Sequence, residues 1–142
     1  MNITEVQIFK YEVTGTYIHI FNKTICDMKI FDSELAGSKV EKVIYENVEF
    51  SHTDFQGTDF INVIFIDCKF NNCTFHFIKF KDCNFIACKI ENCSFCITNS
   101  LNCNFLSCTY LNNSWESSSL QGKFIQCNIE ESELKNMEVE AA

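Results

Sequence analysis

The sequence predicts an all-β solenoid, and the prediction depends on three observations. A large residue recurs at every fifth position from Tyr45 to Leu120, with Ser100 as the one exception. A small or compact residue stands two positions before each of these centres, and the other three positions of each unit are mostly polar. A five-residue period matches neither a helix, at about 3.6 residues, nor a strand, at about 2, so it indicates a turn-by-turn repeat. Residues two apart on an extended segment face the same way, so each unit points one small and one large residue inward.

The individual units resemble those of the pentapeptide repeat family, usually written Ala-(Asp/Asn)-Leu-x-x. Clear matches are Asp82-Cys83-Asn84-Phe85, Asn92-Cys93-Ser94-Phe95 and Asn102-Cys103-Asn104-Phe105. Cysteine replaces the usual alanine, and phenylalanine dominates the centre. The resemblance covers roughly residues 20 to 139. It implies a right-handed quadrilateral β-helix with four pentapeptides in each coil.

Four units per coil predict that residues twenty apart stack directly above one another. Weaker units extend the frame upstream to Ile20, which gives about six coils in all. The predicted inward ladders are Phe50/Phe70/Ile90/Tyr110, Phe55/Phe75/Phe95/Trp115, Phe60/Phe80/Ser100/Leu120 and Phe65/Phe85/Phe105. After Leu120 the frame slips by one residue, and the expected centres become Phe124, Ile129, Leu134 and Val139. Gly122 tolerates unusual dihedral angles and is expected to absorb the slip.

We expect one folded domain with a distinct N-terminal end. Residues 1–17 do not hold the five-residue frame and are expected to form a capping segment, with Val6 and Ile8 on a strand. Residues 18–142 form the repeat region and end in an acidic stretch that protects the last coil by charge. Asn and Asp recur two positions after the centres, where they are expected at the corners because they accept left-handed backbone conformations. These corner residues are Asn62, Asp67, Asn72, Asp82, Asn92, Asn102 and Asn112.

Ten cysteines in a short chain ordinarily suggest disulfides or zinc, but their spacing favours another interpretation. Eight occupy the small inward slot, where a free thiol acts as a compact hydrophobe. These eight are Cys68, Cys73, Cys83, Cys88, Cys93, Cys103, Cys108 and Cys127. Cys93 and Cys96 should point to opposite sides, so a shared metal ion is not expected. We therefore expect no metal or cofactor and a reducing, cytoplasmic location, since no secretory signal or membrane-spanning run is found.

The motifs of enzymes and of nucleic-acid binders are missing from the sequence. It contains no phosphate-binding glycine loop, no nucleophile elbow and no His-Glu metal motif. The histidines His19, His52 and His76 are scattered outside the inward slots, and a core filled by its own side chains leaves no substrate cavity. The formal net charge is −8 and no arginine occurs, which disfavours direct contact with phosphates. Binding to another protein through the outer faces is the remaining class of function.

An outward apolar stripe indicates where such a protein binds. Ile66, Ile86, Leu106 and Ile125 each follow a centre by one position, where the chain should face water, and they are expected to stack on one face. Ile64 flanks the lower end, and Phe77 with Ile97 forms a second outward pair. Packing under the N-terminal segment and a local shift of register are the alternative explanations. We interpret the chain as a non-enzymatic binding rod that uses this stripe either to self-associate, as a homodimer, or to act as a scaffold for another protein.

The family resemblance implies a second hypothesis. Several pentapeptide repeat proteins look like DNA in size, shape and charge and protect DNA gyrase and topoisomerase IV from quinolones or peptide toxins. The acidic surface for such a role would be Glu49, Asp54, Asp59, Glu130, Glu131 and Glu133. This chain is shorter than the quinolone-resistance members and has no inserted loop between coils. It is also acidic at both ends and near neutral over residues 66–110, whereas a DNA mimic should carry acid along its length.

Overall fold

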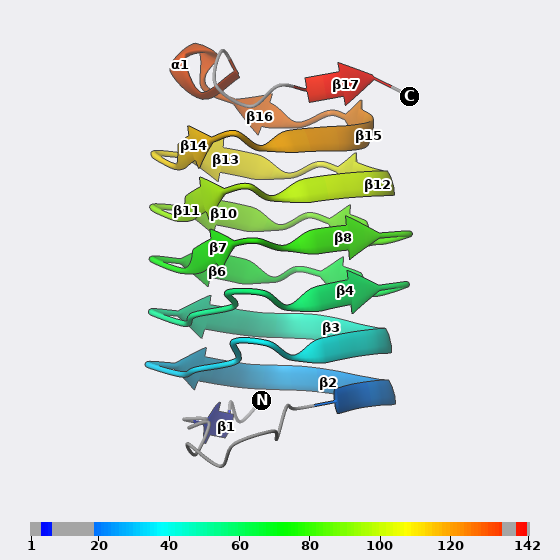
Figure 1. Cartoon of the computed structure of the whole chain (residues 1–142). Helices are drawn as coiled ribbons and strands as arrows, with labels where there is room; N and C mark the ends of the chain where they lie inside the picture. The colour runs from blue at the N-terminus through cyan, green and yellow to red at the C-terminus, as the bar shows by residue number, and fades with distance from the viewer. Residues whose placement is uncertain (1–3, 7–18, 135–138, 142) are drawn as a thin grey trace.

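The protein is a rod of stacked β-coils, with the N-terminus at one end and the C-terminus at the other (Figure 1). The computed structural model describes residues 4–6, 19–134 and 139–141. Parallel strands of successive coils pair at a register of 20 residues, as Tyr45 does with Phe65 and Phe65 with Phe85. Each coil therefore holds four five-residue units, and the rod has four faces and about six coils. The predicted β-helix is confirmed.

Two long strands, β2 (His19–Phe31) and β3 (Lys39–Ser51), start the regular coils and pair along their whole length. Above them, short strands form four stacks, one on each face. One stack is β6 (Lys69–Asn71), β10 (Lys89–Glu91), β13 (Thr109–Leu111) and β16 (Asn128–Ile129). The next is β7 (Thr74–His76), β11 (Ser94–Cys96) and β14 (Ser114–Glu116). The third is β4 (Asp59–Ile61), β8 (Lys79–Lys81) and the first parts of β12 (Asn99–Leu106) and β15 (Ser119–Ile125). The fourth is β5 (Ile64–Ile66), β9 (Asn84–Ile86) and the second parts of β12 and β15.

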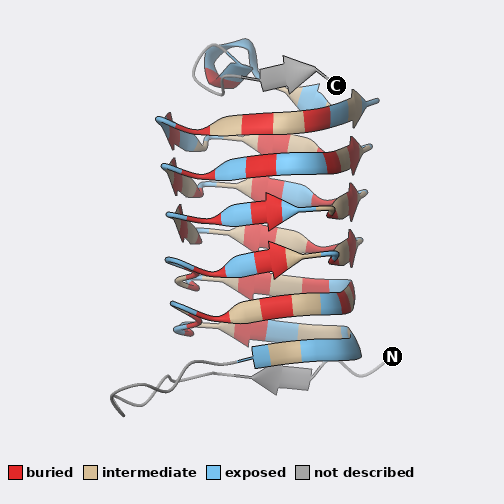
Figure 2. Cartoon of the chain, turned by 45° about the vertical axis from the view of Figure 1, so that its right-hand side comes forward, coloured by how far each residue is buried: buried red, intermediate tan, exposed pale blue. Residues whose placement is uncertain are grey.

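Aromatic rings from the unit centres fill the axis of the rod. Residues twenty apart stack nearly parallel, with ring centroids 5.0 Å apart for Phe50 and Phe70 and 4.7 Å apart for Phe65 and Phe85. Rings of neighbouring faces meet edge to face, as Phe65 and Phe70 do. Both geometries are favoured by the aromatic quadrupole. The buried residues run in vertical lines up the middle of the strands (Figure 2), so the predicted ladders are confirmed.

The small inward residues have a role that their size alone does not reveal. Most donate a hydrogen bond to the carbonyl oxygen of the residue 23 positions earlier, as Cys68 Sγ does to Tyr45 O at 3.3 Å and Thr58 Oγ1 to Leu35 O at 2.8 Å. These thiols and hydroxyls thereby satisfy backbone carbonyls inside the coil. Seven of the eight inward cysteines are buried as predicted, Cys127 is half-buried, and all ten cysteines are free thiols. Burial, together with the neighbouring Cys73 thiol, raises the pKa of Cys93, which keeps this thiol neutral and poorly reactive.

The corners of the coil adopt left-handed backbone conformations. Every Asn and Asp predicted for a corner has a positive φ, for example 54° at Asn62 and 55° at Asp82. The same angle occurs at corner residues of other types, including Phe77 and Ile97. The coil thus imposes the left-handed conformation at each corner, and after glycine, Asn and Asp adopt that conformation with the least strain.

The one-residue shift of the repeat frame occurs just after Leu120, as the sequence predicts. Ser100 pairs with Leu120, but Cys103 pairs with Gly122, so one residue is missing from the upper strand. Gly122 has a φ of 155°, and a Cβ added there would lie 2.0 Å from the carbonyl oxygen of Cys103. The Ser100 hydroxyl donates to Gln121 O at 3.1 Å and accepts from Gln121 N at 2.6 Å, which satisfies backbone groups beside the slip. Leu101 stays 44% exposed and does not move into the inward slot.

The two ends of the rod depart from the regular repeat. At the N-terminal end, β1 (Thr4–Val6) pairs with residues 28–30 of β2 and adds one strand below the first coil. The other predicted capping residues, including Ile8, lie outside the described residues. At the C-terminal end, Val139 of β17 (Val139–Ala141) pairs with Leu120, as the shifted frame predicts. The unit centred on Leu134 was predicted wrongly, because α1 (Glu131–Leu134) replaces its strand and leaves Leu134 49% exposed. Among the described residues, no helix has the length and apolar character needed to cross a membrane.

Candidate protein-binding surface

The predicted apolar stripe lies on the fourth face of the rod, here named the isoleucine face. It is formed by residues 24–26, 44–46, 64–66, 84–86, 104–106 and 123–125. The residues that follow each centre stack in register as one column, here called the second column. Its members above Cys26 are Glu46, Ile66, Ile86, Leu106 and Ile125. Ile125 is 50% exposed, and the other three apolar members are half-buried.

The residues that precede each centre form a parallel column on the same face, here called the first column. Above Thr24 it runs Ile44, Ile64, Asn84, Asn104 and Lys123. Asn104 Nδ2 donates to Asn84 Oδ1 at 2.8 Å, which fixes the two amides as a ladder. The lower half of this column is apolar and the upper half is polar. The isoleucine face therefore presents six aliphatic side chains together.

Two opposite charges stand at the ends of this aliphatic group. Glu46 lies below Ile66 in the second column, and Lys123 lies above Asn104 in the first column. Both side chains are exposed. Neither forms an ion pair with another residue of the described part of the chain. The face thus combines an apolar centre with one acidic and one basic end.

The second predicted pair, Phe77 and Ile97, lies at a corner away from the isoleucine face. These residues follow β7 and β11 and are 55% and 47% exposed. Their φ angles are 58° and 50°, which is costly for bulky side chains. They continue a corner column that begins with Gly37 and Gly57, and Phe77 N donates to Cys96 O at 2.9 Å. The structure therefore separates this pair from Ile66 and Ile86.

The predicted acidic residues of the lower coils do not form a column. Glu49, Asp54 and Asp59 lie on three successive faces of one coil. Glu49 stacks between Lys29 and Lys69, and its carboxylate lies 4.0 Å from Lys29 Nζ. Asp59 stacks between Lys39 and Lys79. Lysines therefore interrupt the negative charge along the rod.

The acidic C-terminal group divides into exposed and buried members. Glu130 and Glu131 are exposed, but Glu133 is only 4% exposed, so its prediction as a surface acid was wrong. Its Oε1 accepts hydrogen bonds from Trp115 Nε1 at 2.9 Å and Asn113 Nδ2 at 2.8 Å. The last coil leaves these two N–H groups without a coil above them, and buried donors need acceptors. Glu133 therefore closes the end of the core.

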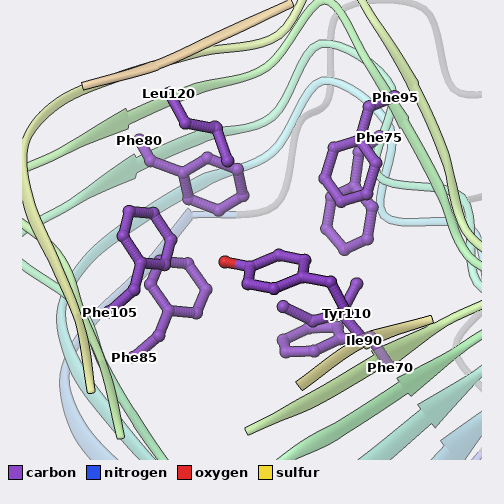
Figure 3. A pocket seen from close by; sticks show the side chains of 9 residues that line it. All are labelled: Phe70, Phe75, Phe80, Phe85, Ile90, Phe95, Phe105, Tyr110 and Leu120. Carbon is purple, nitrogen blue, oxygen red and sulfur yellow. The ribbon is translucent and has the colours of Figure 1, made fainter. Parts of the chain in front are cut away.

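A small cavity inside the rod is the nearest feature to an internal ligand site. It has a volume of about 20 Å³ and is lined by Phe70, Phe75, Phe80, Phe85, Ile90, Phe95, Phe105, Tyr110 and Leu120. Phe80 and Leu120 flank Ser100 in their ladder, so the cavity lies where serine replaces a large centre. The Tyr110 hydroxyl points into it toward Phe85 and Phe105 (Figure 3) and has no hydrogen-bond partner among the described residues. Such a lining provides a single polar group and suits neither a water molecule nor a polar substrate. We interpret the cavity as a packing defect.

Replacing Tyr110 with phenylalanine tests this interpretation. We expect Tyr110→Phe to raise the free energy of unfolding by about 1 kcal/mol, because it removes a buried hydroxyl that lacks a partner. Urea unfolding followed by circular dichroism measures the change. A loss of stability of similar size would mean that the hydroxyl binds a water molecule in the cavity.

Comparison with known proteins agrees with this geometry. The family model for pentapeptide repeats (8 copies) matches residues 46–76. The solved pentapeptide repeat protein Rfr23 from the cyanobacterium Cyanothece 51142 is similar at a TM-score of 0.54 and 8% sequence identity, over 98% of this chain and 88% of that chain. Two trypsin-treated variants of QnrB1, a plasmid-mediated fluoroquinolone resistance protein, give TM-scores of 0.42 and 0.31 at 10% and 8% identity. They cover 96% and 99% of this chain and 92% of the QnrB1 chain in each case. No curated protein sequence matches the chain.

The four-faced coil of 20 residues defines the protein as a parallel β-helix of five-residue units. The fold is that of a pentapeptide repeat β-helix, since the repeat, the coil geometry and the match of the family model over residues 46–76 agree. The fold alone does not specify a function, which must be argued from the surfaces that it carries.

Proposed function

We propose that this protein is a non-enzymatic protein-binding rod and that the isoleucine face is its binding surface. Six aliphatic side chains, Ile44, Ile64, Ile66, Ile86, Leu106 and Ile125, stand together on one face. Scattered exposed apolar residues are ordinary, but an aligned group with a polar rim is typical of an interaction site. The grouping of these six side chains is the observation on which the proposal depends.

The rod suits such a role because the binding side chains stand on paired strands over a packed core. The strands under the isoleucine face are held by ladder hydrogen bonds and by the stacked rings of Tyr45, Phe65, Phe85 and Phe105 behind them. Side chains on such a scaffold are ordered before a partner arrives, which lowers the entropic cost of binding. Family members in general are structural or binding proteins, and the proposal is consistent with that pattern.

A double substitution on the isoleucine face tests the proposal. We expect Ile86→Lys combined with Leu106→Lys to abolish self-association of the purified protein, as measured by sedimentation velocity. The circular dichroism spectrum should be unchanged, because both side chains point outward. The matched control is Ile61→Lys combined with Leu101→Lys, which places the same charges in a column of the neighbouring face. The control should associate like the wild type. Equal association of wild type and both variants would contradict the proposal.

A second hypothesis, protection of gyrase or topoisomerase IV by DNA mimicry, is retained because the net charge is −8. The alternation of Glu49 with Lys29 and Lys69 disfavours the DNA-mimicry hypothesis, because a mimic of DNA needs unbroken negative charge. If mimicry operates, a variant with Glu49, Asp54 and Asp59 changed to lysine should lose protection of gyrase from quinolones in a supercoiling assay. The isoleucine-face variant should then protect as well as the wild type.

A further inference from the structure

We propose that the partner of the isoleucine face is a second copy of this chain, bound antiparallel and face to face, with a two-fold axis that passes through Ile86. This inference rests on the proposed function and specifies its partner. It follows from the order of side chains in the two columns of the face and from the positions of Glu46 and Lys123.

The antiparallel arrangement matches apolar with apolar side chains. When two rods pack with their axes reversed, the second column of one faces the second column of the other in the opposite order. An axis at Ile86 then brings Ile86 against Ile86 of the partner subunit and Ile66 against Leu106 of the partner subunit. The three central rungs of the second column are thus aliphatic on both sides, and apolar burial favours this contact.

The parallel arrangement of two rods gives a poor match on the same face. A two-fold axis along the rods sets the second column of one copy against the first column of the other. Ile86 would then face Asn84 of the partner subunit, and Leu106 would face Asn104 of the partner subunit, on both sides of the axis, and only the Ile66 rung would match apolar with apolar. Burying amide groups against aliphatic side chains is unfavourable unless the amides find hydrogen-bond partners. In the antiparallel arrangement the first columns also face each other, so Asn84 meets Asn84 of the partner subunit and Ile64 meets Asn104 of the partner subunit. Two contacts between an amide and an aliphatic side chain are then buried, against four in the parallel arrangement, so the columns favour the antiparallel dimer.

The two charged residues fix the register of the antiparallel dimer. Glu46 lies two rungs below Ile86, and Lys123 lies two rungs above it. An axis at Ile86 therefore places the Lys123 rung of one copy against the Glu46 rung of the other at both edges of the contact, with Lys123 opposite Ile44 and diagonally across from Glu46 of the partner subunit. Moving the axis half a rung upward leaves Glu46 beyond the edge and sets the Lys123 rung against the rung of Ile64 and Ile66, which carries no charge. Complementary charges thus select this register and disfavour its neighbours.

The size of the face indicates how tight the dimer is. With strands about 4.8 Å apart, the five rungs from Glu46 to Ile125 span about 20 Å. Such a patch is smaller than the standard interface of about 800 Å² per partner. We therefore expect reversible dimers with micromolar dissociation constants. The single substitution Lys123→Glu should raise the dissociation constant of the dimer roughly fivefold. Adding Glu46→Lys in the same chain should return the dissociation constant to the wild-type value.

Disulfide cross-linking tests the geometry. The background variant carries serine at Cys26, Cys96 and Cys127, the three cysteines that are not buried. In this background, Ile86→Cys should form a covalent dimer under mild oxidation, because a residue on a two-fold axis meets its own copy. Leu106→Cys alone should not cross-link, but a mixture of Leu106→Cys with Ile66→Cys chains should.

The outcomes separate this inference from the proposed function. Loss of association in the Ile86→Lys and Leu106→Lys double variant, together with an Ile86→Cys cross-link, supports both. The same loss without that cross-link overturns the antiparallel dimer and leaves the isoleucine face as a binding surface. Association that persists in the lysine variant overturns both.

Discussion

Gly122→Ala is expected to lower the free energy of unfolding by about 3 kcal/mol, the most that overpacking ordinarily costs. A Cβ at residue 122 would lie 2.0 Å from the carbonyl oxygen of Cys103 and 2.8 Å from its carbonyl carbon. Both atoms belong to the backbone of a paired strand, so they cannot move without breaking the β12–β15 ladder. The φ of 155° adds strain for any residue with a side chain. Urea unfolding with circular dichroism measures the loss.

The effect of Gly122→Ala should be largest in the last coils, because each coil of a solenoid contacts only its neighbours. Hydrogen exchange of the amides in β15 should therefore accelerate more than that of β5. Gly57→Ala is the matched control, since Gly57 has a φ of 70° but its nearest added contact is at 3.8 Å. We expect the control to lose about 1 kcal/mol from backbone strain alone. Equal losses at Gly122 and Gly57 would refute the role assigned to the close approach.

Phe65→Ala is expected to lower the free energy of unfolding by about 3–5 kcal/mol, the range for removing a fully buried aromatic ring. Phe65 has 0% exposure and stacks on Tyr45 and Phe85, with centroid distances of 5.3 and 4.7 Å. It also meets Phe60 and Phe70 at their edges. The stacked coils above and below cannot collapse around the void, because the ladder spacing fixes their separation.

Phe77→Ala is the control for the loss of an aromatic ring. Phe77 is 55% exposed, so the same substitution should change the free energy of unfolding by less than about 0.5 kcal/mol. Both variants can be compared by denaturant unfolding under the same conditions. A loss at Phe77 as large as that at Phe65 would mean that the corner side chains contribute to the core.

Most of the fold could be predicted because one local rule repeats. Spacing of five places Phe65 above Tyr45 without any further information, and each correct unit fixes the register of the next. Even the slip could be predicted, because Cys127 resumes the cysteine column after it and Gly122 stands at the gap. Periodic sequences reveal long-range contacts that ordinary sequences hide.

The end of the rod could not be predicted from the same rule. Leu134 fits the shifted frame, but Glu133 points inward instead. The reason lies in the donors Trp115 Nε1 and Asn113 Nδ2, which the last coil exposes and which only the folded structure brings together. The hydrogen bonds of the Ser100 hydroxyl could likewise not be predicted from the sequence, since they depend on where the shift of register places Gln121.

The candidate surface was predicted in part. The stacking of Ile66, Ile86, Leu106 and Ile125 followed from the frame and is observed. Ile44 precedes the centre Tyr45 and joins the same face, a residue that the five-residue frame could have identified. The interruption of the acidic surface by lysines could be predicted only with the coil register, because the lysines that stack on Glu49 lie twenty residues away on either side.

Methyl NMR of isoleucine- and leucine-labelled protein over a wide range of concentration tests the central claim most directly. If the isoleucine face binds a second copy, the methyl signals of Ile64, Ile66, Ile86, Leu106 and Ile125 should shift together as concentration rises. The signals of Ile61, Ile97 and Leu101, which lie on other parts of the surface, should stay unchanged. Shifts confined to Ile61, Ile97 or Leu101, or no shift in any of these signals, would contradict the claim.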